Sequence, residues 1–268
     1  MSANELTFWD HLDELRGVLI RIAVAVVVCG CVAFGFKDQL FGVIFAAQDS
    51  DFVTYRLFEA LSFGADSIDA FSVNLISTQL TQQFSTHLSV SMWVGFLVVF
   101  PYILFELFRF ISPALYATER RYAAGVIWWG YIMFVVGVAV SYFLIFPLTF
   151  RFLANYQVSA SVENMIALDS YIGTLVTLCM MMGVLFELPI LCWFFAKLGF
   201  LTADMMRNYR RYAIVVLLFI SALITPTADV ITMVLVALPI YLLYEVSIII
   251  VGQAVKEATT AKRKVDKK

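Results

Sequence analysis

Three glutamates lie where the surrounding sequence is apolar or basic, and each carboxylate is a candidate cation-binding group. Glu14 lies near the N-terminus, Glu119 lies in FRFISPALYATERR at 108–121, and Glu187 lies in CMMMGVLFELPILCW at 179–193. A carboxylate accepts the planar fork of a guanidinium in two parallel hydrogen bonds, which a lysine ammonium cannot reproduce. Glu14 and Glu119 therefore predict a receptor for a basic ligand that carries two arginines.

The same carboxylates also have a purely structural interpretation. Glu14 has Arg16 nearby and Glu119 has Arg120 nearby, and each pair would merely fix a loop. Glu187 lies several residues from either end of its apolar run, where an ionisable group costs about 2.5–3.5 kcal/mol to insert. It must be protonated, paired with a neighbouring helix, or exposed to a water-filled hollow. At this depth a functional polar site is favoured over a structural hydrogen bond.

The remaining acidic positions have simpler expectations. Asp229 follows a Thr-Pro-Thr turn and is a natural N-cap for the last helix, and Glu245 is expected to partner Arg210 or Arg211. The sequence contains no phosphate-binding glycine loop, metal-ligand cluster or nucleophile–base pair. It therefore predicts neither an enzyme nor a bound cofactor or metal.

The elements that position these residues are predicted to be membrane-spanning helices. The chain has 268 residues, of which 62% are hydrophobic and 14% charged, and its mean hydropathy is +0.89. Apolar runs of about 20 residues can each cross a bilayer, and these runs lack the alternation of a β-barrel strand. The predicted fold class is all-α, with six transmembrane helices at about 17–36, 87–107, 122–150, 169–196, 212–225 and 230–252.

The last two predicted spans are expected to be short. The run from Tyr212 to Ile224 has only thirteen residues before Thr225-Pro226-Thr227, which gives about 20 Å of helix. This is less than the roughly 30 Å of a hydrocarbon core. The following run is interrupted by Pro239 and Glu245.

The distribution of basic residues predicts the orientation of a single membrane domain, 1–268. Most of the 18 Lys and Arg residues fall on one side of the predicted spans. The positive-inside rule places that side, with both termini, in the cytoplasm. The domain then has an interfacial helix at 1–16 that starts at a Thr7 capping box, a periplasmic loop at 37–86, a first cytoplasmic loop at 108–121, and a basic tail at 253–268.

Several segments together resemble the TatC family, the multispanning receptor subunit of the twin-arginine protein translocase. FWDHLDELRGVLIR resembles its opening motif, and PYILFELFRFISPALYATERR resembles its first cytoplasmic loop. VLFELPI matches its fourth-span motif, and ITPTADVITMVLVALPIYLLYE resembles its last hairpin. The resemblance runs from about residue 6 to residue 252.

This resemblance implies a cupped helical bundle in the bacterial cytoplasmic (inner) membrane. It also implies transport of folded proteins, driven by the proton-motive force without ATP. The implied partners are twin-arginine signal peptides, single-span TatA- or TatB-type subunits, other copies of the chain and membrane lipid, but no nucleic acid. By motif position, the signal-peptide residues are Glu14, Glu119 and Phe110, the intramembrane acid of the concave face is Glu187, and the motif acids of the last hairpin are Asp229 and Glu245.

The sequence also departs from the family pattern and leaves alternatives open. Glu106 stands where many members carry glutamine, and Met233 stands where some have a polar residue. The alternative function is a proton-coupled small-solute carrier that uses Glu187. A third class is a membrane scaffold without transport activity.

Overall fold

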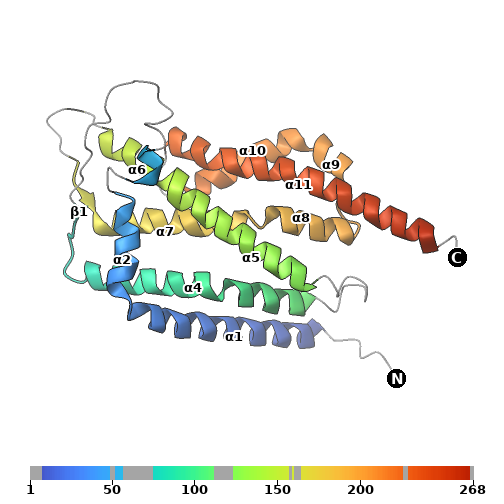
Figure 1. The fold of residues 1–268 in the computed structure, drawn as a ribbon, viewed down its shortest axis with the longest axis horizontal. Helices are drawn as coiled ribbons and strands as arrows, with labels where there is room; N and C mark the ends of the chain where they lie inside the picture. The colour runs from blue at the N-terminus through green and yellow to red at the C-terminus, as the bar shows by residue number, and fades with distance from the viewer. Residues whose placement is uncertain are drawn as a thin grey trace. The chain divides into compact units, whose positions relative to one another are not determined.

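The structure is a computed structural model, and it is almost entirely helical (Figure 1). Its described residues form two compact units, Met1–Val43 with Thr81–Ile132, and Ile44–Leu80 with Met133–Lys268. The backbone is described for residues 8–48, 52–56, 75–111, 123–156, 159, 164–225 and 229–265. Side chains are described over the same ranges except at 8–11, 111, 123, 124 and 257–265.

Two long helices dominate the first unit. Helices α1 (Phe8–Phe34) and α4 (Gln82–Ile111) pack side by side along their lengths (Figure 1). Glycine permits this close packing, because a Cβ on Gly95 would lie 2.6 Å from the backbone nitrogen of Gly30. Small residues at such contacts let helix backbones approach closely within a membrane.

The bounds of α1 and α4 differ from the predicted boundaries in two respects. Helix α1 is continuous from Phe8, so the predicted helix at 1–16 joins the first span without a break. Helix α4 extends to Ile111, so the beginning of the predicted loop 108–121 is helical and Phe110 lies on a helix. The helix ends one residue before Ser112-Pro113, where proline disfavours helical backbone in the residue that precedes it.

The third predicted span is helical from Ala123 onward but contains a π-helix. It consists of α5 (Ala123–Val140), η3 (Ser141–Ile145) and α6 (Phe146–Asn155). Pro147 has no N–H with which to bond the carbonyl of Phe143 four residues earlier. The hydroxyl of Thr54 donates to that carbonyl instead. The hydroxyl of Tyr55 donates to the carbonyl of Pro147 at 3.1 Å, so the short helical turn at 53–56 is fixed on the bulged helix.

The fourth predicted span is broken into two helices at Phe186 and Glu187. Pro189 lies in the first turn of the second helix and cannot donate a backbone hydrogen bond to the preceding turn. The backbone carbonyl of Glu187 accepts hydrogen bonds from Ile190 and Leu191 at 3.0 Å each. The two parts are α7 (Leu168–Leu185) and α8 (Leu188–Lys197).

The last helices of the second unit correct one expectation. Helix α10 (Arg210–Ile224) has 15 residues and is short, as predicted. Helix α11 (Val230–Val265) has 36 residues, so the prediction of a short last helix is wrong. Pro239 does not interrupt α11. The helix-forming Ala, Lys and Glu residues that follow the apolar run extend α11 beyond it. Helix α11 packs against α8, α10 and the short α9 (Ala203–Asn208).

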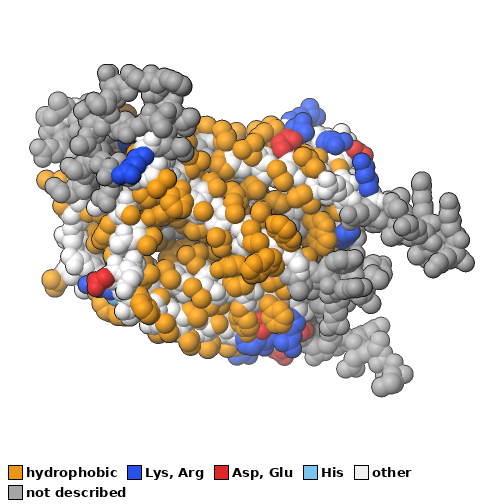
Figure 2. Space-filling model, viewed as in Figure 1, with side chains coloured by type: hydrophobic (Ala, Val, Ile, Leu, Met, Phe, Trp, Pro, Cys, Tyr) orange, Lys and Arg blue, Asp and Glu red, His pale blue; other side chains and the backbone are white. Residues whose placement is uncertain are grey.

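The described residues support a protein that crosses a membrane several times. Five helical segments are long and apolar enough to span a bilayer. On the face drawn in Figure 2, apolar side chains cover the middle stretches of the helices, and Lys and Arg gather toward helix ends. The only strands described, β1 (Leu75–Ile76) and β2 (Ile166–Ala167), are two residues long and pair in parallel. The all-α fold class is confirmed. The five segments are Leu12–Phe34, Gln82–Phe110, Gly125–Asn155, Leu168–Lys197 and Val230–Lys256.

Candidate functional site

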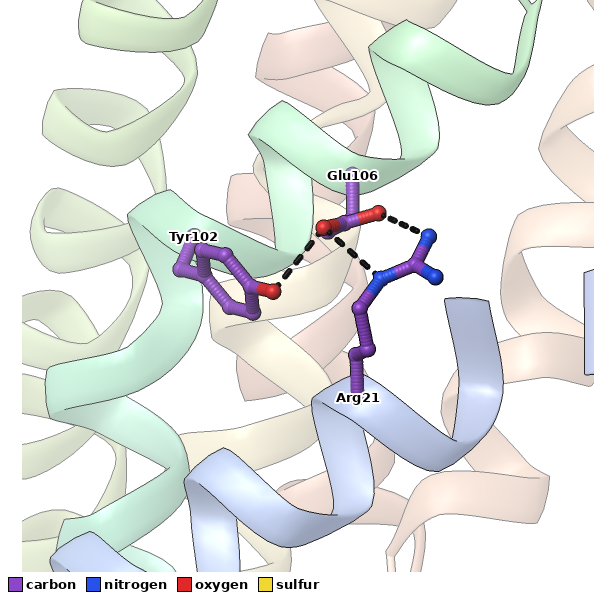
Figure 3. Close-up of polar contacts among 3 residues, drawn as sticks. All are labelled: Arg21, Tyr102 and Glu106. Carbon is purple, nitrogen blue, oxygen red and sulfur yellow. Dashed lines mark hydrogen bonds and ion pairs between the residues drawn. The ribbon is translucent and has the colours of Figure 1, made fainter. Parts of the chain in front are cut away.

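An ion pair joins α1 to α4 in the first unit (Figure 3). The Arg21 guanidinium donates from Nε to Oε1 of Glu106 at 3.1 Å and from Nη2 to Oε2 at 2.8 Å. The hydroxyl of Tyr102, one helical turn before Glu106, donates to Oε1 at 2.9 Å. The carboxylate of Glu106 therefore accepts three hydrogen bonds, two of them in the bidentate geometry that arginine makes possible.

This ion pair is not evident from the sequence alone. Arg21 and Glu106 lie 85 residues apart, and only the packing of α1 on α4 brings them together. Two signals were present in the sequence. Each residue is a charge within or beside an apolar run, and Tyr102 precedes Glu106 by the four residues that place both on one helix face.

The predicted signal-peptide residues of the first unit lie beyond this pair on the same two helices. Glu14 precedes Arg21 by seven residues, which is about two turns and nearly the same face of α1. Phe110 follows Glu106 by four residues on α4 and is half-buried. Glu119 lies outside the described residues. The structure thus brings Glu14 and Phe110 onto the two helices that the Arg21–Glu106 pair holds together.

The Glu14 side chain is exposed, and it forms no ion pair with any described residue. In particular, it does not pair with Arg16, whereas Arg120 lies outside the described residues. An exposed carboxylate that pairs with no described basic residue remains able to accept a guanidinium from another chain.

Glu187 lies at the junction of α7 and α8 with only 7% of its surface exposed. Its Oε1 atom has no hydrogen-bond partner among the described residues. Glu187 is thus buried within the fourth predicted span, and no neighbouring described helix satisfies that oxygen. Such a group is costly in the membrane interior.

The acidic residues of the last hairpin have structural partners. Asp229 Oδ1 accepts a hydrogen bond from the backbone N–H of Thr232 at 2.6 Å, as predicted for an N-cap of α11. Glu245 pairs with Arg210, with Nε–Oε1 and Nη2–Oε2 distances of 2.9 Å. The hydroxyl of Tyr241 donates to Oε1 of Glu245 at 2.8 Å. The expected pairing of Glu245 is thus confirmed for Arg210.

These elements and carboxylates define the class of the protein. It is a multi-pass helical membrane protein in which some intramembrane acids are neutralised by arginine while Glu187 is buried and Glu14 is left accessible. Among the described residues, no three His, Cys, Asp or Glu side chains come together as a metal-binding group.

Comparison with known proteins identifies the family. The sequence profile described as Sec-independent protein translocase protein (TatC) matches residues 10–239. The TatC protein of Blattabacterium is 32% identical over 254 residues, covering 92% of this chain and 95% of its own. The TatC protein of Desulforapulum autotrophicum is 34% identical over 242 residues, which cover 90% of this chain and 83% of that protein.

Solved structures agree with the sequence comparison. A crystal structure of the twin-arginine translocase receptor TatC superposes with a TM-score of 0.74 at 31% identity, covering 91% of this chain and 99% of that one. A second crystal structure of TatC, in DDM, superposes with a TM-score of 0.73 at 30% identity, covering 89% of this chain and 98% of that one. The chain belongs to the TatC family of protein translocase components, which are not enzymes.

Proposed function

We propose that this protein is the receptor subunit of a twin-arginine translocase. It binds twin-arginine signal peptides at the cytoplasmic face and nucleates a complex that exports folded proteins with the proton-motive force. The observation that carries the proposal is the exposed Glu14 carboxylate, which no described basic residue neutralises. Glu119 and Phe110 complete the site, the former by its motif position and the latter by its place near the end of α4.

The orientation and partners follow from the same reasoning. The basic residues concentrated on one side of the spans support cytoplasmic termini in a bacterial inner membrane. TatA- or TatB-type single-span subunits and further copies of the chain are the proposed protein partners. Glu187 is the proposed intramembrane polar site for transport or partner assembly, and Asp229 and Glu245 hold the last hairpin in shape through the bonds described above.

A binding measurement with paired peptides tests the receptor site. Wild-type protein is expected to bind a signal peptide with Arg-Arg about tenfold or more tightly than the same peptide with Lys-Lys, because each charged bidentate contact contributes about 1.5–3 kcal/mol. Replacing Glu14 and Glu119 together by glutamine removes both charges and is expected to abolish the preference. Photo-crosslinking of the peptide from positions 14 and 119 checks where it binds.

Asp13→Asn is the matched control, because Asp13 is an exposed acid that directly precedes Glu14 on α1. Like each Glu→Gln substitution, Asp13→Asn removes one negative charge. The variant should nevertheless keep the preference for the Arg-Arg peptide. Persistence of the preference in the double glutamine variant would show that the arginine pair is read elsewhere.

A proton-coupled carrier is the second candidate, and the buried, unsatisfied Oε1 of Glu187 is the observation that favours it. A carrier moves a small solute without a signal peptide or partner subunits. Reconstituted protein alone is expected to show no proton-coupled solute uptake, and uptake that Glu187→Gln abolishes would support the carrier instead.

A further inference from the structure

The ion pair of the first unit is asymmetric in its exposure. The Arg21 side chain is 47% exposed, whereas the Glu106 side chain is 3% exposed. The guanidinium therefore covers the carboxylate from outside, and its removal would open a recess of guanidinium shape. The recess would present two carboxylate oxygens and would be bordered by the Tyr102 hydroxyl, which donates to Oε1 in the structure.

The recess lies next to the proposed signal-peptide site. Glu106 is one turn from Phe110 on α4, and Arg21 is about 10 Å along α1 from Glu14. A Cβ on Gly17 would lie 3.4 Å from Nη1 of Arg21, so the absence of a side chain at position 17 leaves room beside the guanidinium on the side toward Glu14. An extended peptide held at Glu14 can span such a distance with about three residues.

Exchange of one guanidinium for another conserves the bonds at Glu106. An incoming arginine restores both bidentate hydrogen bonds. The buried carboxylate of Glu106 is therefore paired with a guanidinium both before and after the exchange. Lysine is a compact point charge and cannot bridge both oxygens in the same plane. The recess would therefore add to the discrimination between Arg-Arg and Lys-Lys peptides only once Glu14 and Glu119 hold the peptide, so loss of both glutamates still abolishes the preference.

We propose that Glu106 and Tyr102 form a guanidinium-binding subsite, which Arg21 occupies in the free protein and one arginine of a bound signal peptide enters by displacing Arg21. The subsite rests on the proposed receptor function for its natural ligand. The capacity of the subsite to bind a guanidinium ion is independent of the proposed receptor function.

Chemical rescue tests the subsite itself. In full-length Arg21→Ala protein, ethylguanidinium at millimolar concentration is expected to raise the melting temperature by about 3 °C in a saturable manner. Ethylammonium at equal concentration should not. The double variant Arg21→Ala/Glu106→Gln is the matched control, because it lacks both charges of the pair and should show no response.

Each outcome of the rescue experiment decides the question. Arg21→Ala protein that purifies only in the presence of ethylguanidinium supports the subsite. Equal responses of the single and double variants overturn it. So does failure of Arg21→Ala to fold with ethylguanidinium when the double variant folds.

Peptide binding then tests the exchange. Removal of the resident arginine should tighten Arg-Arg peptide binding by about fivefold, because the competing occupant is gone. The Lys-Lys peptide should be unaffected. If wild-type protein prefers Arg-Arg but Arg21→Ala leaves the affinity unchanged, the exchange is wrong while the receptor function stands. If wild-type protein has no preference, the receptor function itself fails, whatever the rescue result.

Discussion

The same arrangement of a tyrosine, a glutamate and an arginine occurs once in each unit. The first unit has Tyr102, Glu106 and Arg21, and the second unit has Tyr241, Glu245 and Arg210. In both, a tyrosine four residues before the glutamate donates to Oε1, and an arginine of another helix bridges both carboxylate oxygens. A charge placed within a mostly apolar helix is thus satisfied by one local and one long-range partner. The local partner is readable from a Tyr-x-x-x-Glu spacing, but the long-range partner is not.

Replacing Glu187 is expected to change the stability of the protein. Its buried Oε1 atom lacks a partner among the described residues, and an apolar residue of similar volume removes that cost. Glu187→Leu is therefore expected to raise the free energy of unfolding by about 1–3 kcal/mol while it impairs export. Thermal unfolding in detergent and an export assay measure the two effects.

Glu187→Gln is the companion variant. It removes the ionisable group but leaves a buried polar amide, so its gain in stability should be smaller than that of leucine. A leucine variant that is less stable than wild type would show that the carboxyl is satisfied in the membrane. Unchanged export would show that Glu187 has no functional role.

At the scale of elements, the sequence predicted where helices occur better than how they are interrupted. Long apolar runs located the spans because length and hydropathy alone decide that question. The π-helix at η3 was not predicted, because neither composition nor periodicity marks one additional residue in a helical turn. The break at Glu187 was not predicted, since a single proline such as Pro189 is compatible with either a kink or a full break of the helix.

The contact between Thr54 and η3 yields the element-scale prediction. Thr54→Val keeps the shape of the side chain but leaves the carbonyl of Phe143 without the hydroxyl donor, at a cost of about 1–3 kcal/mol. In a Pro147→Ala background, residue 147 regains an N–H that can bond this carbonyl. The effect of Thr54→Val should then be much smaller.

A double-mutant cycle of thermal stabilities measures this coupling. Ser89→Ala is a suitable control, because the Ser89 hydroxyl is exposed and donates to the backbone carbonyl of Ser85 on its own helix. Equal effects of Thr54→Val in both backgrounds would mean that the missing proline N–H is not what the threonine replaces.

For the whole molecule, helix α10 decides the topology. Five long segments alone would place the two termini on opposite sides of the membrane, whereas a sixth crossing by α10 places them on the same side. Fifteen residues give about 22 Å of helix, so α10 can cross only where the bilayer is thinned or where neighbouring helices cover its ends.

Reporter fusions test the whole-molecule prediction. A reporter active only in the cytoplasm should be active at the C-terminus and after Asn208, and inactive after Thr225, because α10 crosses between these two positions. The same reporter placed after residue 48 should be inactive and serves as the control. Activity after both Asn208 and Thr225 would mean that α10 does not cross.

Family membership was recognisable from the sequence because its motifs occur in order along nearly the whole chain. The site was only partly predictable. Glu14, Phe110 and Glu187 were proposed from residue type and motif position, and their exposed or buried surroundings became visible only once the helices were packed. Arg21 gave no indication of a site, since a basic residue in the first turns of a span has a sufficient explanation in the positive-inside rule.

The π-helix also determines how chain length can vary at this position. A helix residue advances the direction of its side chain by about 100°, so removing one residue from most of the segment 123–155 would rotate every later side chain onto a different face. Removal of one residue within Ser141–Ile145 instead allows the wider turn to close as a regular α-helix. The faces of α5 and α6 would keep their alignment, which makes this short stretch the place where homologous chains can differ by a single-residue gap without repacking the span.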